Sequence, residues 1–149
     1  SIPLKIIGEG PSRDRVIAAA EKNSNIQWLG QISQDDILSI LGNASFLIMP
    51  SICYETFGRT IIEAFAKGTP VISSRIGALT ELVDDSRTGL HFEPGNPDDL
   101  VQKIHQFVND TSKQAQMRLT ARKEYLKNFT AQKNYPVLMS IYDKAISHN

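Results

Sequence analysis

Short apolar runs alternate with amphipathic helical patterns along residues 4–108, and this alternation limits the fold more than any other feature of the chain. The runs, for example Phe46–Met49, are bounded by glycine, proline or serine. Strands that alternate with helices form βαβ units, which build a mostly parallel sheet. We therefore expect an α/β fold with helices on both faces of the sheet. The predicted strands cover residues 4–7, 26–29, 45–49, 70–73 and 89–92.

Capping residues place the helices between these strands. Ser33 precedes two acids and predicts a helix over residues 34–43, and Asn96 followed by proline predicts another over residues 97–108. A further helix should run from about Arg59 to a stop at Gly68.

Beyond Asp110 the strand pattern ends, and two helices are expected over residues 112–127 and 134–146. The length favours one domain, because domains average roughly 100 to 200 residues. Residues 1–110 should form its sheet-containing part and residues 111–149 its C-terminal helices. The last helix has an apolar face that needs cover from this chain or from another domain. That face consists of Val137, Leu138, Ile141, Tyr142 and Ala145.

The composition argues against several classes of protein. Sixteen basic and sixteen acidic side chains give no net charge, whereas a nucleic-acid-coating protein needs a basic excess. The single cysteine, Cys53, excludes internal disulfides and fits the reducing cytoplasm. No apolar run approaches the roughly 20 residues that span a bilayer. The three histidines lack the spacing of metal ligands, so we expect no metal site. Taken together, these features lead us to expect a cytoplasmic protein with no cofactor and no transmembrane segment.

A glycine pair, Gly8 and Gly10, follows the first predicted strand and opens a helix. The third glycine of a dinucleotide-binding loop is absent because Arg13 occupies its position, and no acidic residue closes the second strand. The pair therefore fits a tight turn better than a phosphate cradle, while a supporting role in lining a cleft stays open.

The segment between the third and fourth predicted strands carries the strongest functional signal. Glu55 lies on its loop and Glu63 about one turn inside its helix, with seven residues between them. Ligands of open parallel sheets bind outside the carboxyl ends of the strands, where this loop would lie. A carboxylate can accept from two hydroxyls of a sugar ring. Isolated glutamates usually lie in solvent, but Glu63 has apolar neighbours in the sequence, among which an unpaired carboxylate is costly.

The same helix begins between the two glutamates, at Phe57–Thr60. Its unpaired amides and dipole attract phosphate, and Gly58 has no Cβ to obstruct a ligand. These features suit a molecule with a central phosphate and hydroxylated rings at both ends. On a second loop, Gly77 either presents amides to an anion or sugar or forms a plain turn. Arg75 either approaches a phosphate or lies in solvent.

These residues resemble the C-terminal domain of GT-B fold glycosyltransferases, and more narrowly the retaining group with a Glu-x7-Glu motif, the glycosyl transferases group 1. The resemblance covers about residues 4–108. It rests on Gly8–Pro11, Trp28–Gly30, Glu55–Ala64, Gly68–Ile72 and Gly77–Glu81, in that order. It implies a Rossmann-like doubly wound sheet and, in the intact protein, a hexosyltransferase-type activity with a nucleotide diphosphate sugar as donor substrate.

The resemblance also implies roles for individual residues. Glu55 would be catalytic and would contact hydroxyls of the donor sugar, and Glu63 would hold the ribose hydroxyls of the nucleotide. A second set would bind the distal phosphate and part of the sugar: Phe57, Gly58, Arg59, Thr60 and Gly77. A third set would line the nucleotide and its base: Gly8, Gly10, Gly30, Gln31 and Ile32.

The chain departs from the family pattern at its start. The family's domain opens with a strand and helix whose Arg and Lys clamp the diphosphate, whereas Ser1–Lys5 resemble the second strand. We therefore expect the first βα unit to be missing and this fragment to be inactive without the rest of the enzyme. If a central strand is missing, the sheet would close the gap, pair with the sheet of another copy, or keep an unstable edge. The acceptor, a glycan or glycolipid, would bind a separate N-terminal domain, and the intact protein would be cytoplasmic or membrane-peripheral.

Three functions are open at this point. The first is the donor-binding domain of a glycosyltransferase in glycan, polysaccharide or glycolipid biosynthesis. The second is a nucleotide-sugar epimerase of the same fold, which would form an epimer without an acceptor. The third is a flavodoxin-like binding module, which would bind flavin and no nucleotide sugar. The breadth of the motif match favours the first.

Overall fold

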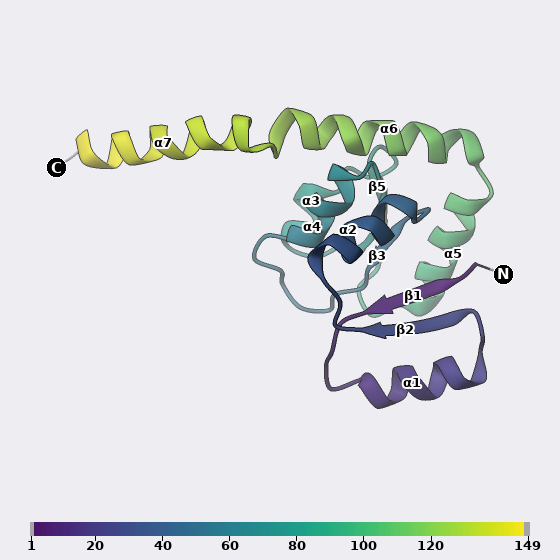
Figure 1. Cartoon of the computed structure of the whole chain (residues 1–149). Helices are drawn as coiled ribbons and strands as arrows, with labels where there is room; N and C mark the ends of the chain where they lie inside the picture. The colour runs from purple at the N-terminus through teal and green to yellow at the C-terminus, as the bar shows by residue number, and fades with distance from the viewer. Residues whose placement is uncertain (1, 148–149) are drawn as a thin grey trace. The chain divides into compact units, whose positions relative to one another are not determined.

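The structure, a computed structural model, describes residues 2–147, which form seven helices and two sheets with five strands in all, and the strands within each sheet are parallel (Figure 1). The strands are β1 (Leu4–Ile7), β2 (Ile26–Gly30), β3 (Leu47–Met49), β4 (Val71–Ser74) and β5 (Gly89–Phe92). The helices are α1 (Arg13–Lys22), α2 (Gln34–Asn43), α3 (Arg59–Ala66), α4 (Ala78–Leu82), α5 (Pro97–Val108), α6 (Thr111–Asn128) and α7 (Ala131–Ser147). The predicted α/β fold with parallel strands is confirmed.

The chain divides into two compact units, residues 1–39 and residues 40–149, and each is described by itself. In the first unit β1 pairs in parallel with β2, and α1 packs against β2. Beyond the ladder, the Gly8 amide donates to the Gly30 carbonyl at 2.8 Å and Trp28 Nε1 donates to the Gly8 carbonyl at 3.2 Å. These bonds hold the carboxyl ends of the two strands together. The division expected at residue 110 stays a prediction.

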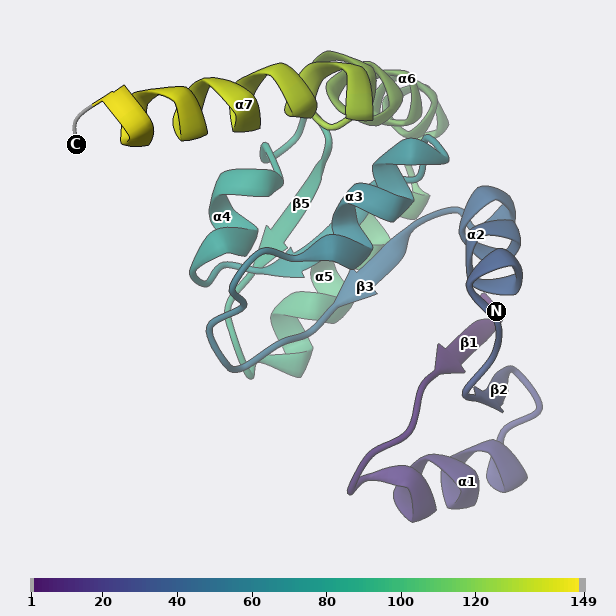
Figure 2. The ribbon, with the colours of Figure 1, turned by 60° about the vertical axis from the view of Figure 1, so that its left-hand side comes forward.

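The second unit contains a sheet in the order β3–β4–β5, whose outer strands β3 and β5 are labelled in Figure 2. Every residue of β4 and of β5 is buried, as predicted for parallel strands covered on both faces, whereas the residues of β3 are half-buried. Among the described residues no ladder joins β1 or β2 to this sheet. The expected loss of a central strand, and the way in which the sheet would meet it, self-association included, stay predictions.

The core of the second unit is apolar and lies between its sheet and its helices. One face of β4 and β5 presents Ile72, Leu90 and Phe92, which pack with Phe107 of α5 and Met117 of α6. Because side chains alternate along a strand, Ser73 and His91 point to the opposite face. There they form a buried hydrogen-bonded pair, with 3.1 Å between Ser73 Oγ and His91 Nδ1.

The predicted helix starts are confirmed by their caps. Ser33 Oγ accepts from the amide of Asp36 at 3.1 Å at the start of α2. Asn96 accepts from the amides of Asp98 and Asp99 at the start of α5, both at 3.1 Å. Helix α3 differs, since Gly58 precedes it and supplies no side-chain cap.

Helix α6 packs against α3 and contributes two arginines to the ends of neighbouring helices. Arg118 donates to the carbonyls of Ala44 and Gly42, at 2.7 and 3.3 Å, where α2 ends. Arg122 donates to the Ala66 carbonyl at the end of α3. Carbonyls that the helices leave unpaired are thereby satisfied.

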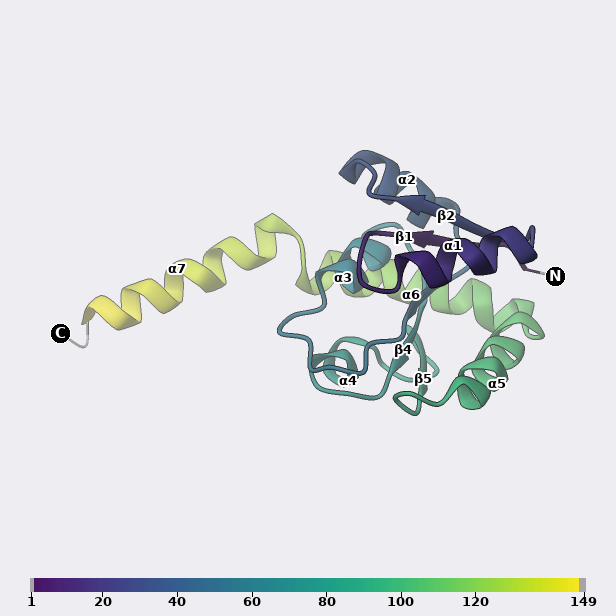
Figure 3. The same ribbon diagram turned by 90° about the horizontal axis from the view of Figure 1, so that it is seen from below.

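Helix α7 continues from α6 and projects from the rest of the second unit (Figures 1 and 3). All of its residues are exposed, including the apolar side chains predicted to form one face. Nothing among the described residues of the second unit covers that face. No helix within residues 2–147 has both the length and the apolar content needed to cross a membrane.

Candidate functional site

The candidate site is built on the segment between β3 and the first turn of α3. Pro50 ends the strand, and residues 50–58 form an irregular loop at its carboxyl end. The chain then enters α3 at Arg59, as predicted. Both glutamates singled out in the sequence belong to this segment.

The carboxylate of Glu55 is half-buried and held by a neighbour on its own loop. Ser51 Oγ donates to Glu55 Oε1 at 3.0 Å, and both side chains are partly buried. The second oxygen, Oε2, receives no hydrogen bond from a described residue. The carboxylate is therefore oriented on one side and available as an acceptor on the other.

Gly58 turns the loop into the helix. Its φ of 72° and ψ of 45° lie in the left-handed region, which favours glycine. A Cβ at this position would lie 2.8 Å from Leu82 Cδ1, so a larger residue would require the Leu82 side chain of α4 to shift. With no side-chain cap, the first amides of α3 remain available to an anion.

Glu63 lies one turn inside α3 and forms an ion pair with Arg59. Arg59 Nε lies 3.1 Å from Glu63 Oε1. The Glu63 side chain is 18% exposed and the Arg59 side chain 79% exposed. The Glu63 carboxylate therefore lies in a poorly solvated place and has a charged partner.

Gly77 precedes α4 on the second loop and contacts the first loop through Tyr54. Its φ of 50° and ψ of −139° again favour glycine. A Cβ there would lie 2.8 Å from Tyr54 Cδ1, so the tyrosine ring lies directly against the Gly77 backbone. The two loops that carry predicted donor contacts are thereby in contact.

The residues predicted to line the nucleotide belong to the first unit. Gly8 follows β1, Gly10 lies two residues further, and Gly30 ends β2 as the only buried residue within residues 2–39. Gln31 is exposed and Ile32 half-buried. Their roles toward a nucleotide stay predictions.

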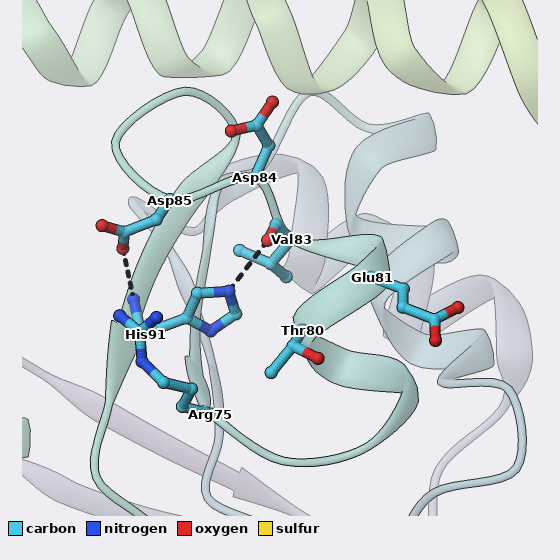
Figure 4. A pocket seen from close by; sticks show the side chains of 7 residues that line it. All are labelled: Arg75, Thr80, Glu81, Val83, Asp84, Asp85 and His91. Carbon is cyan, nitrogen blue, oxygen red and sulfur yellow. Dashed lines mark hydrogen bonds between the residues drawn. The ribbon is translucent and has the colours of Figure 1, made fainter.

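A pocket of about 310 Å³ lies beside α4 and β5 (Figure 4). Its lining includes Arg75, His91 and three acids, Glu81, Asp84 and Asp85, but neither Glu55 nor Glu63. His91 Nε2 donates to the Val83 carbonyl at 2.8 Å, and the His91 amide donates to Asp85 at 2.8 Å. The hydrogen bond to Asp84 raises the pKa of the Arg87 guanidinium above its usual value. We name this the His91 pocket.

Two contributors to the site were not found by sequence reasoning. Ser51 lies four residues before Glu55, a spacing that gives a weak signal in an irregular loop. Tyr54 meets Gly77 across 23 residues of sequence, and nothing in the sequence indicates that contact. Within residues 2–147 no group of three His, Cys, Asp or Glu side chains is arranged to hold a metal ion.

Comparison with known families gives one match over most of the chain. The family model described as glycosyl transferases group 1 matches residues 1–124. This range includes both units' strands and the whole candidate site.

Individual relatives agree with the family match. An uncharacterized glycosyltransferase of Methanocaldococcus jannaschii is 34% identical over 95% of this chain and 40% of its own length. A glycogen synthase of Mycobacterium tuberculosis is 32% identical over 83% of this chain and 30% of its own length. The chain therefore spans well under half the length of these relatives.

Solved structures give the same result for the fold. A glycosyltransferase from Rickettsia africae matches with a TM-score of 0.88 at 29% identity, over 100% of this chain and 41% of its own. HepE of Anabaena, solved in complex with UDP, matches with a TM-score of 0.83 at 22% identity, over 95% of this chain and 41% of its own. At that identity the second likeness shows the fold only.

Proposed function

We propose, from the premise that the chain belongs to the glycosyl transferases group 1, that it is the donor-binding domain of a glycosyltransferase. The intact protein would move a sugar from a nucleotide diphosphate sugar to an acceptor hydroxyl. The observation that carries the proposal is the pair Glu55 and Glu63 on either side of an uncapped helix start, within a segment that the family model covers.

The geometry supports different roles for the two carboxylates. Glu55 keeps one acceptor oxygen available beside the loop and would bind hydroxyls of the donor sugar as the catalytic residue. Glu63 would hold the ribose. Between them the amides of Phe57, Gly58, Arg59 and Thr60, with Gly77, would bind the distal phosphate, because helix-start amides stabilise negative charge.

The reaction would need no protein nucleophile. The bond between the anomeric carbon and the phosphate oxygen breaks, a bond from that carbon to the acceptor oxygen forms, and the acceptor proton passes to the released nucleotide diphosphate. Negative charge grows on the leaving phosphate, where the amides at the start of α3 would stabilise it. We propose retention of anomeric configuration, as the Glu-x7-Glu motif implies.

The finer assignments also belong to the proposal. A hexose as the transferred sugar, a glycan or glycolipid acceptor on another domain, and a cytoplasmic or membrane-peripheral place all follow from the family resemblance. The glycogen synthase relative supports polysaccharide synthesis as one setting. The chain without the rest of its enzyme is expected to be inactive.

Transfer kinetics of the full-length enzyme test the assignment. Glu55→Ala and Glu63→Ala should each lower kcat/KM by about 10- to 100-fold, the value of a charge-assisted hydrogen bond. Lys103→Ala, which removes a partly buried ion pair on α5, serves as the control and should leave the rate unchanged. Near-normal kinetics in both glutamate variants, or epimer formation without any acceptor, would overturn the proposal.

A further inference from the structure

The side chain of Glu63 has one partner among the described residues, and that partner is Arg59. Arg59 Nε donates to Glu63 Oε1 at 3.1 Å, and Oε2 receives no hydrogen bond from a described residue. The side chain is only 18% exposed, so a hydrogen bond is needed to compensate the carboxylate for the water contacts that it has lost. The guanidinium is 79% exposed and therefore loses little hydration of its own.

The stability of α3 does not explain this ion pair. Arg59 is the first residue of the helix, where a cation opposes the positive end of the helix dipole. An arginine four residues before a glutamate is also the less favourable order of the two charges. Helices α1, α2, α4 and α5 have acids in their first turns, whereas α3, like α6 and α7, has none. A residue placed against the local helix preference is typical of a functional site.

We propose that Arg59 is a positioning residue for the nucleotide ribose. Its Nε–H fixes the Glu63 carboxylate so that Oε2 accepts a ribose hydroxyl. This role belongs to the side chain and is separate from the contact of the Arg59 amide with phosphate. The inference rests on the proposed function, because it requires that Glu63 face the ribose. A carboxylate already held in place loses less freedom when the nucleotide binds.

The rival role for Arg59 is direct contact with a phosphate. Its remaining guanidinium N–H groups have no partner among the described residues, and a phosphate is a good acceptor for them. The two roles differ in which part of the nucleotide the side chain affects. Removal of the ribose hydroxyls abolishes the first role and leaves the second intact.

The test is a set of binding titrations on the chain with Arg59→Leu, Arg59→Lys and a matched control. Lys103→Leu removes the same charge and another ion pair with four-residue spacing, on α5. UDP, GDP and ADP are compared first, and the tightest binder is then compared with its 2′,3′-dideoxy analogue by calorimetry and by ligand-observed NMR. Arg59→Leu should weaken binding of the ribonucleotide about fivefold, the upper value for an ion pair at a protein surface. It should leave the dideoxy analogue unchanged, and Arg59→Lys should restore part of the loss.

The other possible results of the titrations would overturn either the inference about Arg59 or the proposed function as well. Equal weakening of both nucleotides by Arg59→Leu would assign the side chain to phosphate, and no weakening would remove it from the site; either result overturns the inference. If wild type binds none of the three nucleotides, or if Glu63→Gln binds as wild type does, the proposed function fails as well. Circular dichroism checks that Arg59→Leu is folded. If Arg59→Leu unfolds, the affinities of Arg59→Lys for the ribonucleotide and for its dideoxy analogue decide between the two roles.

Discussion

At the scale of single residues, Gly77 is constrained in two ways. Its φ of 50° is a conformation that side chains other than glycine rarely adopt. The space where a Cβ would lie is also occupied by the ring of Tyr54, at 2.8 Å. The position is therefore fixed both by backbone geometry and by the contact that joins the two loops.

We expect Gly77→Ala to destabilise the protein by about 2 kcal/mol, the usual value for backbone strain of this kind together with a steric contact. Chemical denaturation measures the change. The double variant Tyr54→Ala/Gly77→Ala should recover part of the loss, because it removes the ring and keeps the strain. Tyr54 is 81% exposed, so Tyr54→Ala alone should have nearly the same free energy of unfolding as wild type. A Gly77→Ala protein as stable as wild type would contradict this account.

Sequence reasoning singled out the two glutamates, the helix start and the loop glycines as candidates, and their roles stay predictions; it did not find Ser51 or Tyr54, which contact them. Glu55 and Glu63 could be predicted because a spaced pair within a loop and helix is a local pattern. The contact of Tyr54 with Gly77 depends on how two loops fold back on each other, and local patterns do not specify it. The Arg59–Glu63 pair has helical spacing, but its orientation at an uncapped helix start is visible only in the structure.

At the scale of elements, the predicted bounds are close to those observed, and the differences have local causes. Strand β5 matches its prediction, whereas β3 begins at Leu47 and not at residue 45. The ladder with β4 begins at Val71, because Pro70 has no amide hydrogen to donate. Phe46 lies before the ladder and its ring packs edge-on against Phe107, with 5.1 Å between ring centroids.

Helix α6 contributes to stability through Arg118. We expect Arg118→Ala to lower the free energy of unfolding by about 2 kcal/mol, because two partly buried carbonyls at the end of α2 lose a charged donor. Urea denaturation measures this loss. Lys123→Ala, on an exposed position of the same helix, is the matched control and should change stability little. Equal effects of the two variants would mean that the Arg118 bonds contribute nothing specific.

At the scale of the whole molecule, the two units differ in how much apolar side chain they bury. The buried hydrophobic residues of the structure lie between Leu41 and Ala121. Within residues 2–39 no hydrophobic side chain is fully buried, and the sheet has only two strands. The sequence predicts strands in both regions but does not show this contrast, because the apolar runs of the two units look alike.

This contrast predicts uneven protection from hydrogen exchange. Amides of β1 and β2 should exchange at least about 10-fold faster than those of β4 and β5, because a two-stranded sheet without a buried core opens more easily. Exchange followed by mass spectrometry on the chain measures both regions in one experiment. Equal protection would show that the two units unfold as one.

The central claim is that the start of α3, between Glu55 and Glu63, binds the donor nucleotide. A two-dimensional ¹⁵N NMR titration of the 149-residue chain with UDP, GDP and ADP tests it most directly. The account predicts that at least one nucleotide shifts the amide signals of Gly58, Arg59 and Thr60, and that Glu63→Gln weakens this response. The absence of shifts with all three nucleotides, or shifts confined to residues of the His91 pocket, would contradict it.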